Sequence, residues 1–195
     1  KTLRLLYQKL IKFNADLATR SSIAKCLTES ARSIEAEEWN SIAKHKDEYS
    51  PALSSLKNNG YLSLSIPWAN EITKELNSIK NKGIAIPSGG GRTETEYLEG
   101  VSNLESIQKL INNKRIFNLV SLYLGAPAKL SSVHAWWQYP MGPDHQPSNA
   151  QLWHRDRDDL SFLKLFFNAT DVDDSSGPHA YIPGSHDPKK LSEIF

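Results

Sequence analysis

The sequence changes character at Pro127, and this change constrains the fold more than any other feature. Before it, hydrophobic residues recur every three or four positions, which is typical of amphipathic helices. After it, short aromatic and branched stretches alternate with turns rich in Pro, Gly, Asp and Ser, which is typical of strands. Helices followed by strands predict an α+β protein whose strands form a sandwich or barrel.

The part of the chain before Pro127 is predicted to contain several helices and one strand. An Asn-Asn-Gly sequence at 58–60 is a good helix stop, and Gly125 closes a long periodic stretch. Residues 61–66 alternate between hydrophobic residues and Ser, which predicts a half-buried strand that Pro67 ends. Residues 87–100 are polar and rich in Gly and predict a mobile loop. The expected helices cover 1–13, about 22–44, a short segment ending at 58–60, 70–80 and 103–124.

The part after Pro127 supplies the expected strands. They cover 130–139, 151–156, 162–172 and 179–182, and turn residues separate them.

Composition excludes several classes of protein. The chain has 195 residues, 39% of them hydrophobic, and a formal charge of +1, so it is no general nucleic-acid binder. Its single cysteine, Cys26, excludes an intramolecular disulfide framework and a cysteine-based metal cluster. No apolar run approaches the length of a transmembrane helix. These features predict a soluble, cytoplasmic protein without nucleic-acid or membrane partners.

The densest group of chemically active residues is Gln151 to Asp159. On an extended strand, residues i and i+2 point to the same side, so His154 and Asp156 can present a nitrogen and an oxygen to one point. Such a pair suits an iron site with two His ligands and one carboxylate, whose other positions stay open. By itself the spacing favours a solvated, charge-rich turn over a metal site.

The flanking motifs add specificity. Trp153-His154-x-Asp156 precedes a stretch that ends in Thr-Asp-Val at 170–172, a turn to Gly-Pro at 177–178, and Ile-Pro-Gly-Ser-His at 182–186. Tyr-Leu-Gly-Ala-Pro at 123–127 lies upstream. Over about residues 120–190, this order of motifs resembles the phytanoyl-CoA dioxygenase family of Fe(II)- and 2-oxoglutarate-dependent oxygenases.

The resemblance implies a fold and an activity. The fold would be a double-stranded β-helix, a jelly roll, with residues 1–60 as a helical lead-in and 61–195 as an incomplete oxygenase domain with packed helices. His154 and Asp156 would be two of three iron ligands. The activity would be hydroxylation of a small organic or lipid-like substrate with O2, since Asp156 stands where related halogenases carry a small residue.

The family also needs a second histidine ligand and an arginine for 2-oxoglutarate, both well after the Pro-Gly-Ser-His motif. This chain ends nine residues after His186, so we expect both beyond residue 195 and regard the chain as a C-terminally truncated fragment. The alternative is a non-catalytic binding or structural jelly-roll domain with an incomplete metal site. A metal-dependent hydrolase would fit the His154 and Asp156 pair but not the flanking motifs.

Three further residues are candidates for the 2-oxoglutarate site. Lys164 would offer a cation to a carboxylate, Phe166 matches a family position near the cosubstrate, and Tyr139 would line the pocket. Ordinary alternatives stand beside them: a solvated strand lysine for Lys164, and core or surface packing for the two aromatic residues.

Overall fold

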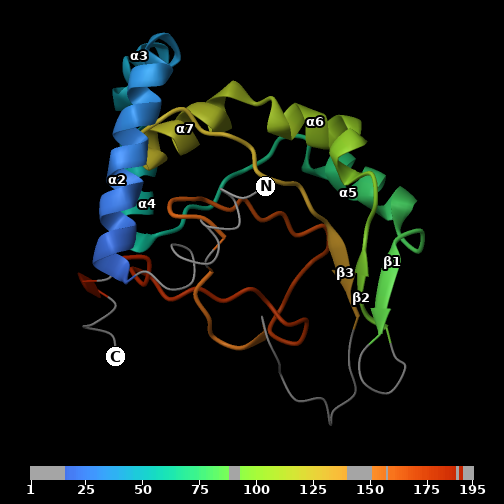
Figure 1. Cartoon of the computed structure of the whole chain (residues 1–195). Coiled ribbons are helices and arrows are strands. Elements are labelled where there is room, and N and C mark those ends of the chain that lie inside the picture. Colours follow the sequence, from blue (N-terminus) through green and yellow to red (C-terminus); the bar gives the residue numbers. More distant parts are fainter. Residues whose placement is uncertain (1–15, 88–92, 140–150, 157, 188, 191–195) are drawn as a thin grey trace, which may run out of the picture. The chain divides into compact units, whose positions relative to one another are not determined.

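The computed structural model describes residues 16–87, 93–139, 151–156, 158–187 and 189–190 (Figure 1). Contacts divide the chain into two units. The first comprises Lys1–Lys57, Phe117–Ala128 and Pro147–Leu165, and the second comprises Asn58–Ile116, Lys129–Gln146 and Phe166–Phe195. The predicted division at residue 60 stays a prediction.

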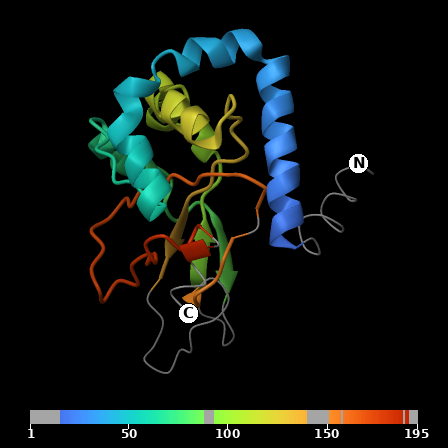
Figure 2. The same cartoon turned by 90° about the vertical axis from the view of Figure 1, so that its left-hand side faces the viewer.

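Helices dominate the N-terminal part, as predicted. They are α2 (Leu17–Ile34), α3 (Ala36–Ala43), the 3-10 helix η2 (Lys46–Tyr49) and α4 (Ser50–Asn59) (Figure 2). Asp16 begins α2, because its carboxylate accepts the backbone N–H of Thr19 at 2.8 Å. The single helix expected over 22–44 is two helices, since Glu35 leaves the helical backbone (φ −110°, ψ 42°). Gly60, at φ +82°, follows α4 at the predicted stop.

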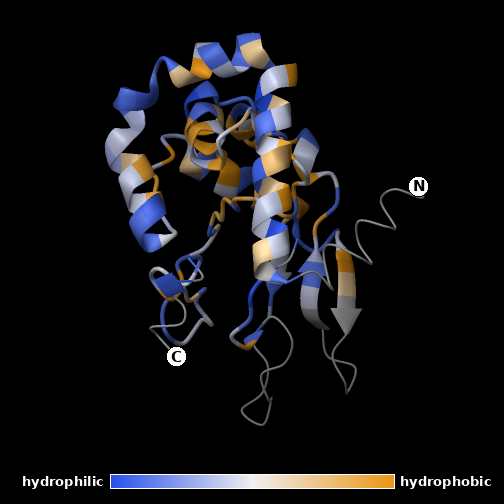
Figure 3. Cartoon of the chain, turned by 60° about the vertical axis from the view of Figure 1, so that its left-hand side comes forward, coloured by the Kyte–Doolittle hydropathy of each residue, from blue (hydrophilic) through white to orange (hydrophobic). Residues whose placement is uncertain are grey.

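The first unit buries hydrophobic residues from several helices and leaves others in solvent. Figure 3 shows hydrophilic and hydrophobic residues interleaved along α2, where Ile34 is 82% exposed. Only one stripe of such a helix is shielded from solvent. The stability of α2 therefore comes from packing of that stripe rather than from the hydrophobicity of the whole helix. Among the described residues of this unit, the buried hydrophobic ones are Ile42, Leu53, Leu56, Leu119 and Ala126.

The helix expected over 103–124 is also interrupted. The structure has the 3-10 helix η3 (Val101–Asn103), α6 (Glu105–Ile111) and α7 (Lys114–Leu124). The side-chain oxygen of Asn113 accepts the backbone N–H of Ile116 at 3.1 Å. Asn113 therefore caps the start of α7, which separates α7 from α6. Within the described residues, no helix combines the length and the hydrophobicity that crossing a membrane requires.

The second unit contains a small antiparallel sheet. Its strands are β1 (Ile84–Pro87), β2 (Thr93–Tyr97) and β3 (Trp136–Gln138), in the order β1-β2-β3 (Figure 1). Ile84, Tyr97 and Trp136 are paired across the three strands. The loop prediction for 87–100 is therefore wrong at Pro87, which ends β1, and over 93–97, which form β2, while residues 88–92 lie outside the described residues.

No jelly roll is seen in the described part of the chain, and the strand predictions largely fail. Residues 61–66, 151–156, 162–172 and 179–182 form no strand, and only 136–138 of the stretch 130–139 pair (Figure 2). Alternation states which side chains share a face, but a strand also needs a hydrogen-bonded neighbour, which alternation does not specify. The helix expected over 1–13 lies outside the described residues.

The core of the second unit lies between its helices and its sheet. Ile72 and Leu76 of α5 (Ala69–Ile79) pack with Leu98, Val101 and Ile107. The bounds of helix α5 differ from the predicted 70–80 by one residue at each end. The helix is predictable because Ile72, Leu76 and Ile79 share one face. Partly buried hydrophobic residues extend this core, among them Ile66, Trp68, Trp137 and Phe167.

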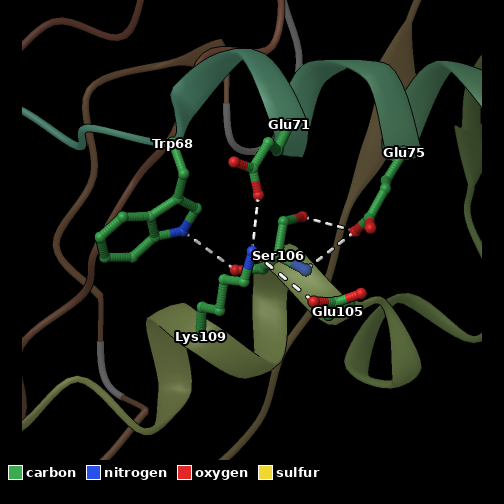
Figure 4. Close-up of polar contacts among 6 residues, drawn as sticks. All are labelled: Trp68, Glu71, Glu75, Glu105, Ser106 and Lys109. Atoms are coloured by element: carbon green, nitrogen blue, oxygen red, sulfur yellow. Dashed lines mark hydrogen bonds and ion pairs between the residues drawn. The ribbon is translucent and has the colours of Figure 1, made fainter.

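A polar clasp joins α5 to α6 above this core (Figure 4). The Glu75 carboxylate accepts the backbone N–H of Ser106 at 3.0 Å and its hydroxyl at 2.5 Å. The indole N–H of Trp68 donates to the Ser106 carbonyl at 3.1 Å, and Lys109 donates to Glu71 at 2.8 Å. Ser106 is 1% exposed, so each of its polar groups needs such a partner.

A matched pair of leucine substitutions tests the core of this unit. Leu76 is 6% exposed and Leu130 is 64% exposed. We expect Leu76→Ala to lower the free energy of unfolding by about 2–5 kcal/mol, because it leaves a cavity. Leu130→Ala should change it by less than about 0.5 kcal/mol. Urea denaturation measures both, and equal losses would contradict the core assigned here.

The clasp predicts a pH dependence of stability. Hydrogen bonds from the Ser106 hydroxyl and backbone, with attraction from Lys109, hold the pKa of Glu75 below its ordinary value. The resulting stability is present above the unfolded-state pKa of about 4.3 and is lost as the pH falls through the lower folded-state pKa. Glu75→Gln should therefore lose less stability than the wild type on acidification. The control Glu99→Gln should keep the wild-type slope in urea titrations from neutral to acidic pH.

Candidate functional site

His154 and Asp156 lie on an irregular segment of the first unit, and their side chains converge. The distance from His154 Nε2 to Asp156 Oδ1 is 3.4 Å. The other ring nitrogen, Nδ1, lies 2.7 Å from the backbone carbonyl of Leu152. A strand is therefore not needed to bring the pair together, since the local backbone does so without a ladder.

The Leu152 contact defines how the imidazole can act. A carbonyl oxygen only accepts, so Nδ1 must carry the proton in this contact. In the neutral ring, Nε2 is then an acceptor that faces a carboxylate oxygen, and two acceptors repel each other. A proton on Nε2 or a cation between the two atoms removes that repulsion. An imidazole nitrogen in a fixed tautomer and a carboxylate oxygen are suitable ligands for a divalent metal such as Fe(II).

Lys164 lies against the second oxygen of the same carboxylate. Its ammonium is 2.6 Å from Asp156 Oδ2 and 2.7 Å from Asp158 Oδ2. Desolvation lowers the pKa of Lys164, but the hydrogen bonds to the two aspartates outweigh it and leave that pKa raised. Within the described segment, the protein's own cation thus occupies the carboxylate that the sequence assigns to a metal.

The pair lies at the surface of the described structure. The side chains of His154 and Asp156 are 45% and 38% exposed. Among the residues described, no group of three or more His, Cys, Asp or Glu is arranged to hold a metal ion. The two predicted ligands are therefore near each other, and a complete ligand set is not formed within the described ranges.

Tyr139 belongs to the second unit and has a partner there. Its hydroxyl donates to Glu96 Oε2 at 2.7 Å, and the backbone N–H of Gly83 donates to the other oxygen at 2.9 Å. These two hydrogen bonds lower the pKa of Glu96, and the bond to Glu96 raises the pKa of Tyr139.

Phe166 also belongs to the second unit. Its ring stacks on that of His179, with a centroid distance of 4.5 Å and an interplanar angle of 28°. Phe166 is 53% exposed, so in the described structure it is a surface residue rather than a core one.

The structure brings together three of the five predicted residues, His154, Asp156 and Lys164. Sequence reasoning missed the partners Asp158 and Glu96. Asp158 continues the i, i+2 series of His154 and Asp156, so alternation alone points to it. Nothing local marks Glu96, because its role depends on Tyr139, which is 43 residues away in sequence.

Comparison with known proteins identifies no relative: no family model, curated protein or solved structure matches the chain.

Competition for Asp156 gives a testable prediction. If the Lys164 ammonium holds this carboxylate, Lys164→Met should raise the affinity of the chain for Co(II) by several-fold, roughly as expected for removing one cation from a shared anion. The exposed Lys114, replaced by Met, is the matched control and should leave the affinity unchanged. Isothermal titration calorimetry measures both variants. An unchanged or lower affinity of Lys164→Met would show that Lys164 does not hold Asp156 in solution.

Proposed function

We propose that His154 and Asp156 are two ligands of a mononuclear Fe(II) site in a 2-oxoglutarate-dependent dioxygenase. The enzyme would belong to the phytanoyl-CoA dioxygenase family, with a jelly-roll fold and a cytoplasmic location. Its reaction would be the hydroxylation of a small organic or lipid-like substrate with O2. The observation that supports this most is the 3.4 Å approach of His154 Nε2 to Asp156 Oδ1, with Nδ1 directed to the Leu152 carbonyl.

The roles of the residues follow from this geometry. The Leu152 carbonyl keeps the proton on Nδ1, which leaves the Nε2 lone pair available as a ligand. The Asp156 carboxylate supplies the second donor from the same side of the chain. When bound, Fe(II) with 2-oxoglutarate would supply the oxidising chemistry that these side chains lack.

Lys164 has two roles in this proposal. Without a metal its ammonium neutralises Asp156 and Asp158, which would otherwise repel each other. With a divalent cation bound at Asp156 Oδ1, the contact of Lys164 with Oδ2 would weaken, because the two positive charges repel each other. The Lys164 ammonium would remain beside the proposed metal ligands, where it would attract a carboxylate of the cosubstrate.

A non-catalytic domain is the second candidate, and one observation favours it. The carboxylate of Asp156 already has a cation partner in Lys164, so its charge is compensated without a metal. In that case the Lys164 bridge would be purely structural, and metal would bind weakly or not at all.

Single substitutions of the two ligands separate these candidates. We expect His154→Ala and Asp156→Ala each to weaken Co(II) binding by at least about tenfold, since loss even of a residue that supports a ligand costs that much. The matched controls are His179→Ala and Asp174→Ala, both exposed residues of the second unit, and they should bind as the wild type does. Co(II) is chosen because its visible spectrum reports binding without turnover.

The outcomes discriminate clearly. Loss of binding in both ligand variants but in neither control supports the metal site. Wild-type binding that survives both substitutions would contradict it, and failure of the wild type to bind would favour the structural domain. Thermal unfolding of each variant shows whether it still folds.

A further inference from the structure

Helix α2 carries its largest described hydrophobic side chains on a face that stays open to solvent. Ile23, Leu27 and Ile34 are spaced by four and seven residues, so they share one face of the helix. Leu27 is 55% exposed and Ile34 is 82% exposed. Among the described side chains of this 18-residue helix, none is buried. Helix α2 therefore has little of the packing that stabilises helices in water.

The covered side of α2 consists of small and polar residues instead. Thr28 and Arg32 lie against Gly125, which follows α7, and Arg32 Nε donates to the Gly125 carbonyl. Ala24 and Ala31 are partly buried, as Thr28 is. A helix in a folded domain normally covers its largest hydrophobic residues first, so we expect another segment to pack on the open face.

Residues 1–13 lie outside the described part of the chain, but their sequence has the pattern of a segment that fits this face. Leu3, Leu6, Leu10 and Phe13 are spaced by three, four and three residues. Such alternation is the spacing at which two helices pack side by side. The face of α2 has the same kind of spacing, so the two patterns are compatible.

The connection to α2 determines how this segment would lie. Residues 14–16 separate Phe13 from Leu17, the first residue of α2. A connection of about two to five residues joins helices that lie side by side and antiparallel. With a helical rise of about 1.5 Å per residue, Leu3 would lie about 15 Å from Phe13, and Leu27 lies about 15 Å from Leu17. The two leucines would therefore lie at the same level.

We propose that the open face of α2 at Ile23 and Leu27 is the docking surface for residues 1–13 of the same chain, which pack on it as an antiparallel helical hairpin. Leu3 would contact Leu27, and Leu6 would contact Ile23. The contact would give α2 the hydrophobic burial that the described residues do not supply.

A second copy of the chain is the other occupant to test. The N-terminal segment is favoured because it is attached directly to the start of α2, where closing a short loop costs little entropy. A second copy would lose its translational and rotational freedom on binding, which costs far more. The hairpin leaves Ile34 outside the contact, because Lys1 would reach only the level of Glu29.

Disulfide trapping on the full 195-residue chain tests the proposal. In a Cys26→Ser background, Leu27→Cys is combined with Leu3→Cys in one variant and with Leu6→Cys in another. We expect mild oxidation to close an intramolecular disulfide in at least one of them, because paired cysteines need Cα atoms within about 7 Å. Mass spectrometry measures the loss of both thiols.

Two control pairs have the same background. Leu3→Cys with Ile34→Cys places the second thiol on the same face but about 10 Å further along α2, and Leu3→Cys with Lys25→Cys places it on the opposite face. Both should stay reduced over the same time. Closure in neither Leu27 pair, or equally fast closure in the controls, would overturn the proposal. Disulfide-linked dimers that form faster from Leu27→Cys alone than from Lys25→Cys alone would assign the face to a second copy and also overturn it.

Hydrogen exchange gives a second test without engineered cysteines. Leu6→Ser should raise the amide exchange rates of α2 about tenfold, because the helix loses packing on its open face. The control Leu5→Ser changes the same residue type one position earlier, off the face shared by Leu3 and Leu6, and should leave those rates unchanged. Unchanged exchange of α5 in both variants shows that the rest of the chain still folds. Equal effects of Leu6→Ser and Leu5→Ser on α2 would overturn the proposal.

Discussion

The hydrogen bonds between Glu75 and Ser106 are the constraint on which most of the second unit depends. Ser106 is almost fully buried, yet its N–H, hydroxyl and carbonyl all have partners in α5 or just before it. This satisfies a donor at the start of α6 and fixes the two helices above Ile72 and Ile107.

Three carboxylates in this protein illustrate how much their surroundings decide their roles. Glu75 is held by the backbone and hydroxyl of one buried serine, which makes it structural. Glu96 of β2 is held by the Tyr139 hydroxyl and the Gly83 backbone, which lie beside the two neighbouring strands. Asp156 is held by Lys164 and faces Nε2 of His154, the pair that we propose as metal ligands. A carboxylate whose partners are fixed supports the fold, whereas a carboxylate whose partner can be exchanged is a candidate for a binding site.

The sequence predicts the helices of this chain better than its strands, and the reason is physical. Helix α5 and the end of α4 are specified by nearby residues. Hydrophobic periodicity and hydrogen bonds within four residues determine α5, and the Asn-Asn-Gly sequence determines the end of α4. The breaks at Glu35 and Asn113 depend on single backbone and capping contacts that periodicity does not report. Strands at 162–172 would need distant partners, which alternation cannot supply. For the same reason, the nearness of His154 and Asp156 is predictable, whereas the pairing of Tyr139 with Glu96 is not.

The proposed function requires that His154 bind a metal through Nε2 while Nδ1 stays protonated on the Leu152 carbonyl. Long-range 1H–15N correlation NMR of the histidine rings, recorded with and without Zn(II) as a diamagnetic substitute, tests it most directly. The account predicts that Zn(II) shifts the Nε2 resonance of His154 to the range of a ligated nitrogen and leaves Nδ1 protonated. Binding of Zn(II) with the His154 ring unchanged, or through its Nδ1, would contradict the account.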